Sequence, residues 1–331
     1  MYISRPNFPT IEERVDKDLV RLATEYLRNN LALGKNETIL IVTVTEMLKT
    51  EAAIWTTAAQ ELSESIELVC LHDMSHSGEE PPEEIIAAAT NASVTIFQTD
   101  FSLTHTQAGK NALLSGGRAL SLPGADLNLI KMALETDYVA LKTLGLSLEK
   151  KLRAGETIRV TSEEGTDLTA GIRTDAVEAE TGFLSQGEIG NLPSGEVFFA
   201  PLLGTTNGTL VIDGSIADDV LDSPITVEIK DGSAVKFSGG VAAKNLQEKL
   251  SQYGEKGMIV AEIGIGTNIN ARVCDNLLEA EKAYGTVHVA FGNSSAIGGE
   301  NNVPIHIDGL VSKPAVYVDE EKILENKAFI L

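Results

Sequence analysis

TILIVTV, residues 38–44, is the first of three short apolar runs in this chain, followed by IELVCL (66–71) and SVTIFQT (93–99). Continuous apolar runs of this length are typical of strands buried on both faces of a parallel sheet. The segments between them, 47–63 and 82–90, have the apolar spacing of helices. This alternation of strand and helix predicts a parallel sheet in the first half of the chain.

The same alternation extends to both sides of these strands. Residues 11–33 place apolar side chains three and four positions apart, as an amphipathic helix does. Further along, we expect a helix over 104–115, a strand at RALSLPG (118–124) and one long helix over 126–152. The sequence therefore predicts an α/β N-terminal domain over residues 1–152.

The second half of the chain has a different pattern. From Thr157 onward, short β-rich segments such as TIRVTS, GTLVIDGS and ITVEIKDG are separated by glycine-containing turns, and Asp231 with Gly232 is typical of a hairpin turn. We expect an α+β C-terminal domain over residues 153–331, with mainly antiparallel strands. A chain of 331 residues is long enough for two such domains.

The composition narrows the classes of partner. The formal net charge is −22 and the pI is near 4.6, so the chain would repel phosphate backbones and anionic lipid surfaces. No apolar stretch is long enough to span a membrane, and residues 1–14 do not have the pattern of a signal peptide. We therefore expect a cytoplasmic protein with a small-molecule or small-peptide substrate, and neither nucleic acid nor membrane as a partner.

The segment VPIHIDG carries the first chemical signal. The two-residue period of a strand puts His306 and Asp308 on one face, opposite Ile305 and Ile307, which can enter the core. An imidazole and a carboxylate on one face can bind the same cation, and this pair suits zinc, manganese, cobalt or iron(II). The alternative is a surface histidine hydrogen-bonded to a neighbouring aspartate.

Other carboxylate and imidazole groups lie in apolar surroundings in the same half of the chain. Glu262 interrupts the apolar strand MIVAEIG, where a lone buried charge would be costly. Glu281 precedes His288 by seven residues, so a short helix can bring it beside the strand that carries the imidazole, although by itself it could be a solvated helix residue. Glu196 starts the apolar strand EVFF and is a candidate ligand or general base. We therefore expect the C-terminal domain to carry a metal site.

The chain resembles the M29 family of metalloaminopeptidases, the aminopeptidase T-like group, in the order and spacing of several segments. These segments are NLPSGEVFFAP, GTLVIDGS, AEIGIGTN, EKAYGTVHVAFG and PIHIDG, and SLTHTQAGKNALLSGGRALSLPG is similar to the N-terminal domain of the broader superfamily. The resemblance implies a set of metal-site residues: Glu196, Glu262, Glu281, His288, His306 and Asp308. It also implies a homodimer and a pair of zinc, cobalt or manganese ions that activate a water to release N-terminal residues from peptides, with Glu196 as a metal-linked residue or base.

The chain departs from the peptidase pattern in places. Ala280 stands where an acidic residue is usual, Ser295 stands where a tyrosine is expected, and the chain is shorter. The same superfamily contains 2,5-dihydroxypyridine dioxygenase-like enzymes, and a resemblance to these implies a single iron(II) ion with His105 as base, although His105 could simply begin a helix. The iron ligands would be Glu262, His306 and Asp308. The full six-residue set makes the aminopeptidase the first hypothesis, the dioxygenase the alternative, and an inactive binding protein the third.

Overall fold

The computed structural model describes residues 3–4, 15–45, 47, 50–71, 74–114, 116–216 and 221–331. The chain forms two compact units, each built from two stretches of sequence. Unit 1 comprises Met1–Thr136 and Gly182–Ser194, and unit 2 comprises Asp137–Thr181 and Gly195–Leu331. The sequence suggested a single domain boundary after residue 152. Instead, the chain enters unit 2 before the helix that ends at Arg153, and returns to unit 1 for one further strand.

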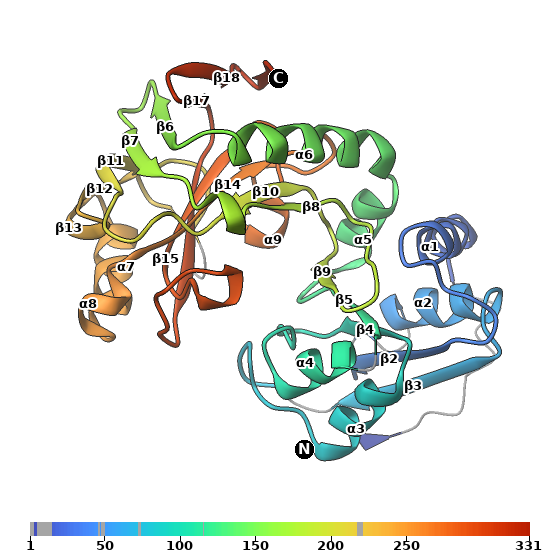
Figure 1. Cartoon of the computed structure of the whole chain (residues 1–331). Helices are drawn as coiled ribbons and strands as arrows, with labels where there is room; N and C mark the ends of the chain where they lie inside the picture. Colours follow the sequence, from blue (N-terminus) through green and yellow to red (C-terminus); the bar gives the residue numbers. More distant parts are fainter. Residues whose placement is uncertain are drawn as a thin grey trace. The chain divides into compact units, whose positions relative to one another are not determined.

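Unit 1 is built on the expected parallel sheet (Figure 1). The strand order is β1-β3-β2-β4-β5-β9, and every neighbouring pair is parallel except β1 with β3. The strands are β1 (Ile3–Ser4), β2 (Thr38–Val44), β3 (Ser65–Leu71), β4 (Val94–Gln98), β5 (Arg118–Ser121) and β9 (Ile189–Asn191). The apolar runs of the sequence therefore form the central strands, whereas β9 is contributed by the segment that returns from unit 2.

The helices of unit 1 pack as two pairs, α1 with α2 and α3 with α4. Their bounds are α1 (Lys17–Asn29), α2 (Glu51–Gln60), α3 (Glu83–Asn91), α4 (Gln107–Leu114) and α5 (Leu127–Leu134). Right-handed crossovers put α2 on one face of the sheet and α3 and α4 on the other, because the strand order runs in opposite directions from β2. Both faces of the central strands are thus covered, as their continuous apolar sequences require.

A largely buried ion pair in unit 1 joins Arg118, at the start of β5, to Glu37, just before β2. The Arg118 guanidinium is 4% exposed and donates to both carboxylate oxygens of Glu37 at 3.0 and 2.9 Å. It also donates to the main-chain oxygens of Leu31 and Ala32. The hydrogen bond from Arg118 is the main cause that holds the pKa of Glu37 below its usual value, against the effect of burial. Arg118 therefore links β5 to the loop that follows α1.

The single helix expected over 126–152 is two helices, and that prediction is wrong. The first is α5, and the second is α6 (Tyr138–Arg153). Asp137 interrupts the helical segment. Its side chain accepts hydrogen bonds from the main-chain amides of Val139 and Ala140, so Asp137 is the N-cap of α6. The apolar period continues across the break, so the sequence pattern did not reveal it.

Unit 2 consists of two antiparallel sheets, as expected. The five-stranded sheet has the order β16-β15-β14-β10-β8, and the eight-stranded sheet has the order β13-β12-β11-β7-β6-β17-β18-β19. The first sheet contains β8 (Glu178–Glu180), β10 (Glu196–Phe199), β14 (Val260–Gly266), β15 (Val287–Gly292) and β16 (His306–Val311). The second contains β6 (Thr157–Ser162), β7 (Asp167–Gly171), β11 (Asn207–Ile212), β12 (Ile225–Lys230), β13 (Ser233–Ser238), β17 (Pro314–Val318), β18 (Glu321–Glu325) and β19 (Ala328–Phe329).

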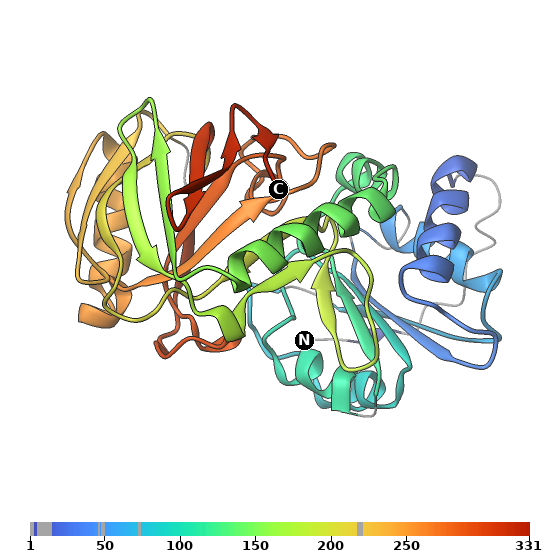
Figure 2. The same cartoon turned by 45° about the horizontal axis from the view of Figure 1, so that its top comes forward.

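The helices of unit 2 are α6, α7 (Val241–Ser251) and the short α8 (Gly254–Gly257) and α9 (Leu277–Ala280). The helix α6 contacts β8 and β10, and Figure 2 shows it alongside these strands. None of the helices in the described ranges combines the length and apolar character needed to cross a bilayer. The observed architecture confirms an α/β unit with a parallel sheet and an α+β unit with antiparallel sheets.

Strand alternation divides the five-stranded sheet into an apolar and a polar face. Ile263 and Val289 are completely buried in the core of unit 2, which also receives apolar side chains from the eight-stranded sheet. The neighbouring positions on the same strands, Glu262 and His288, point to the opposite face because successive side chains alternate. The five-stranded sheet therefore carries its charged and imidazole side chains on the face opposite the one that packs against the core of unit 2.

Candidate metal centre

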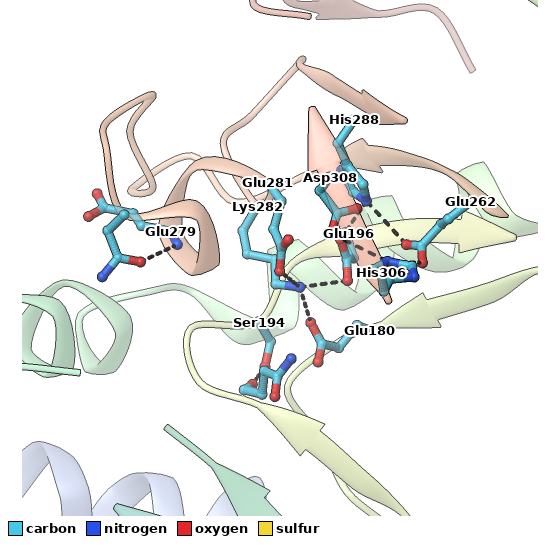
Figure 3. Close-up of polar contacts among 12 residues, drawn as sticks. Glu180, Ser194, Glu196, Glu262, Glu279, Glu281, Lys282, His288, His306 and Asp308 are labelled. Carbon is cyan, nitrogen blue, oxygen red and sulfur yellow. Dashed lines mark hydrogen bonds and ion pairs between the residues drawn. The ribbon is translucent and has the colours of Figure 1, made fainter. Parts of the chain in front are cut away.

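Adjacent strands of the five-stranded sheet each contribute one or two polar side chains to the same place (Figure 3). These are Glu196 on β10, Glu262 on β14, His288 on β15, and His306 and Asp308 on β16. The antiparallel register aligns Ala290 with both Glu262 and Asp308. Side chains that are far apart in sequence are thereby brought together, as the sequence analysis expected.

Glu262 lies at the centre of the arrangement. Its Oε1 atom is 3.2 Å from Nε2 of His288, and its Oε2 atom is 3.5 Å from Nε2 of His306. Nε2 of His288 is also 3.2 Å from Oε2 of Glu196, and Nε2 of His306 is 3.3 Å from Oδ2 of Asp308. The two imidazoles therefore each face a pair of carboxylates and share one of them.

Two groups among the described residues could hold a metal ion, with ligand atoms within 4.8 Å of one another. Glu196, Glu262 and His288 form the buried group, and Glu262, His306 and Asp308 form the open group. The His288 side chain is 1% exposed, whereas the His306 side chain is 35% exposed. The open group therefore contains His306, the most exposed of these ligands and the one that a small molecule can reach most readily.

The ring of His306 is oriented by a main-chain contact. Its Nδ1 atom lies 2.8 Å from the carbonyl oxygen of Asn293, so Nδ1–H can donate and the Nε2 lone pair can face the carboxylates. Such an outer hydrogen bond is typical of metal-binding histidines. Asp308 is buried, and Nε2 of His306 faces its carboxylate, so the contact fits a metal-ligand pair as well as the alternative of a partly exposed histidine paired with its neighbouring aspartate. The two side chains share one strand face, as VPIHIDG predicted.

The sequence analysis missed a buried lysine beside these groups. Lys282 is 0% exposed, and its Nζ lies 2.5 Å from Oε1 of Glu196, 2.9 Å from Oε1 of Glu281 and 3.1 Å from Oε2 of Glu180. We call these four residues the Lys282 cluster. In the sequence, LLEAEKAYG looks like an exposed helix, so neither Lys282 nor Glu180 carried a recognisable signal.

The short helix α9 determines where Lys282 lies. Asn276 caps the helix by accepting from the amide of Glu279, whose buried carboxylate is 2.8 Å from Nε of Arg272. The helix ends at Ala280, so Glu281 and Lys282 follow it in a turn, and the carbonyl of Lys282 accepts from the amide of Asn268 at 2.9 Å. The turn directs both side chains toward the sheet rather than toward solvent.

Burial and neighbouring charges shift the pKa values of the acidic groups in opposite directions. Burial raises the pKa of Glu196 to about 8, although the charges of Lys282 and His288 oppose this shift. Burial also raises the pKa of Asp308, but the charge and hydrogen bond of His306 outweigh it and bring the value to about 2. The acid most able to remain ionised thus belongs to the open group.

Both imidazoles have raised pKa values. Burial lowers the pKa of His288, but its hydrogen bond with Glu262 and the charge of Glu196 outweigh burial and raise the value to about 9. Desolvation likewise lowers the pKa of His306, and the carboxylates of Asp308 and Glu262 raise it to about 10. The carboxylates therefore favour positive charge between them, and the two protonated imidazoles supply it when no cation is bound.

Two candidate residues lie outside these groups. Glu281 belongs to the Lys282 cluster and to neither group of potential ligands among the described residues. His105 is an exposed residue of unit 1, in the turn before α4, and is likewise in neither group. Ser295, at the expected tyrosine position, hydrogen-bonds to Asn293. The roles that the resemblance implied for Glu281 and His105 therefore stay predictions.

A family model described as NicX: 2,5-dihydroxypyridine 5,6-dioxygenase matches residues 18–330. The chain belongs to the NicX family. A curated relative, 2,5-dihydroxypyridine 5,6-dioxygenase of Pseudomonas putida KT2440, is 24% identical over 196 residues, which are 54% of this chain and 55% of the relative. The match thus spans about half the length of that protein.

Solved structures share the fold of this NicX-family chain. The structure of 2,5-dihydroxypyridine dioxygenase from Pseudomonas putida KT2440 matches with a TM-score of 0.81 and 19% identity, covering 96% of this chain and 98% of the other. Wild-type AmpT from Thermus thermophilus matches with a TM-score of 0.68 and 16% identity, covering 95% and 99%. At these identities the likeness concerns the fold alone.

The first hypothesis from the sequence, a metalloaminopeptidase, is wrong. The family model and the curated relative both carry the name of a dioxygenase, and only the fold is shared with AmpT. The names of the family and of the curated relative therefore favour the alternative from the sequence, the dioxygenase, over the aminopeptidase.

Proposed function

We propose that this chain is a mononuclear iron(II) dioxygenase that opens the ring of a dihydroxylated pyridine. The observation that carries the proposal is the open group, which offers one imidazole and two carboxylates in a chain of the NicX family. The names of the family and of the curated relative supply the substrate class.

The residues of the open group fit iron(II). Imidazole nitrogen and carboxylate oxygen are both suitable ligands for this ion, and three protein ligands leave coordination positions for other molecules. The hydrogen bond from Nδ1 of His306 to Asn293 leaves Nε2 available as a ligand atom. When bound, iron(II) would supply the one-electron redox chemistry that allows O₂ to react with an electron-rich ring.

The surrounding residues hold this group in place. His288 contacts Oε1 of Glu262, which leaves Oε2 on the side of His306. Oε1 of Glu196 faces Lys282 in the interior, and Glu196 is not a member of the open group. We propose that His288 positions Glu262 and that Glu262, His306 and Asp308 are the metal ligands.

Two further parts of the proposal come from the resemblance. His105 is proposed as a base that accepts a proton from a ring hydroxyl, since imidazole is the side chain that most often serves as a general base. Self-association as a homodimer also stays a prediction, which light scattering would test. The net charge of the chain is −22, so its field would repel a strongly anionic molecule. We therefore expect a small-molecule substrate that carries little negative charge.

The decisive experiment is anaerobic loading of the protein with iron(II), followed by addition of 2,5-dihydroxypyridine and a measured amount of O₂. We expect consumption of O₂ and loss of the aromatic absorbance in equal amounts, and with ¹⁸O₂ we expect two labelled atoms in the product. Monohydroxylated pyridines serve as controls, because they lack one of the two hydroxyl groups. Loss of the ring under nitrogen, or an iron-loaded protein that consumes no O₂, would contradict the proposal.

A further inference from the structure

The buried group and the Lys282 cluster share one residue, Glu196. Its Oε2 atom lies 3.2 Å from Nε2 of His288, and its Oε1 atom lies 2.5 Å from Nζ of Lys282 (Figure 3). The three ligand atoms of the buried group lie close enough together to hold a cation, and the buried Oε2 atom of Glu196 faces Nε2 of His288 without an aligned hydrogen bond among the described residues. A charged lysine thus contacts a residue that a second metal ion would use.

The ammonium group of Lys282 is surrounded as a metal ion would be. Three carboxylate oxygens lie within 3.1 Å of Nζ, and the side chain is completely buried. A lysine is almost never fully buried unless its charge is paired. Its positive charge therefore neutralises part of the carboxylate cluster, and it also repels any divalent cation that approaches Glu196, since charge interactions are strong in a desolvated interior.

We propose that the Lys282 ammonium takes the place of a second divalent cation, so that this chain binds one metal ion, in the open group. The inference rests on the proposed function only in requiring that the open group binds a metal. It assigns to Lys282 the role of a positioning residue that keeps Glu196 away from the metal and sets the number of ions.

The test is a count of metal ions per chain, with no turnover involved. Manganese(II) is titrated into chelator-treated protein and followed by calorimetry and by the loss of the free-ion electron paramagnetic resonance signal. We expect one ion in the wild-type protein and two in Lys282→Ala and Lys282→Met, because both variants remove the charge and release Glu196. Lys35→Ala is the matched control, since Lys35 forms an exposed pair with Glu64, and it should bind one ion.

A second measurement uses variants that leave Lys282 intact. Glu196→Gln changes the buried group and the Lys282 cluster but no member of the open group, so it should still bind one ion, whereas Asp308→Asn should lose it. Anomalous diffraction from wild-type crystals soaked in manganese should show one peak beside His306. Two ions in the wild-type protein, one ion in a folded Lys282→Met, or loss of the ion in Glu196→Gln would each overturn the inference. If the wild-type protein binds one metal ion per chain but does not cleave the ring, only the proposed function is contradicted.

Discussion

Gly264 lies directly opposite His288 on the neighbouring strand, and the imidazole ring occupies the space where a side chain would be. A Cβ atom on Gly264 would be 2.1 Å from Nε2 of His288. Because the same nitrogen contacts Glu196 and Glu262, the absence of a side chain at position 264 allows the carboxylates and the imidazole to meet.

The first prediction concerns this glycine. In Gly264→Ala the added methyl group must displace the buried ring, which releases Glu262. We expect the free energy of unfolding to fall by about 1–3 kcal/mol and metal affinity to fall about 10- to 100-fold. Gly145→Ala is the control, since a Cβ there makes ordinary contacts of 3.7 Å or more. Denaturant unfolding and metal titration measure both effects, and equal results for the two variants would contradict this role for Gly264.

The second prediction concerns the open group. His306→Ala removes the ligand that is partly exposed, and we expect metal content after loading to fall from one ion per chain to nearly none. His76→Ala should keep its metal, because His76 is an exposed residue of unit 1 whose Nδ1 lies near its neighbour's carbonyl. Plasma mass spectrometry on desalted protein gives the count. Retention of the metal in His306→Ala would exclude Nε2 of His306 as an essential ligand.

The third prediction is that metal binding releases protons. The pKa of His306 is about 10 without a cation, so the ring is protonated at pH 7 and must lose its proton to become a ligand. Asp308, with a pKa of about 2, is already ionised and releases none. Metal affinity should therefore rise about tenfold per pH unit for each released proton, up to the pKa of the ring. Calorimetry at pH 7 in buffers of different ionisation enthalpy measures the number, and a value of zero would argue against an imidazole ligand.

The fourth prediction concerns the stability of unit 1. Glu37→Gln removes the charge that Arg118 binds with two hydrogen bonds, and we expect a loss of about 1–3 kcal/mol in the free energy of unfolding at pH 7. Because the pKa of Glu37 is lower in the folded state, its contribution is complete above the unfolded value near 4.5 and disappears as the pH falls through the folded value. The wild type and Glu37→Gln should thus converge in acid. Glu64→Gln, in an exposed pair, should change stability by less than about 0.5 kcal/mol.

The fifth prediction separates two roles of His105. If this residue is a base, His105→Ala should lower kcat without changing metal content or the thermal unfolding midpoint. A residue that only shapes the turn before α4, whose capping hydroxyl belongs to Thr106, would instead lower the midpoint and leave kcat per folded molecule unchanged. His105→Asn is the second variant, because asparagine keeps a polar side chain suited to turns but cannot act as a base near neutral pH. A fully active His105→Asn would exclude the catalytic role.

Local periodicity determined much of the fold from the sequence. The apolar run TILIVTV coincides with β2, and the neighbouring runs coincide closely with β3 and β4, because a strand buried on both faces needs apolar residues at every position. The same rule placed His306 and Asp308 on one face of β16. By contrast, the break at Asp137 and the return of β9 to the parallel sheet depend on capping and long-range pairing, which leave no mark on the apolar pattern.

The sequence by itself also identified the carboxylates and imidazoles of the open and buried groups, since ionisable residues in apolar strands are costly without a partner. Only the tertiary structure decided which partners they have. Lys282 and Glu196 are separated by 86 positions in the sequence and meet through the turn after α9, so an apparently solvated lysine becomes a buried cation. The physical reason is that strand periodicity sets which face a side chain occupies, whereas sheet register and loop paths determine which charges meet there.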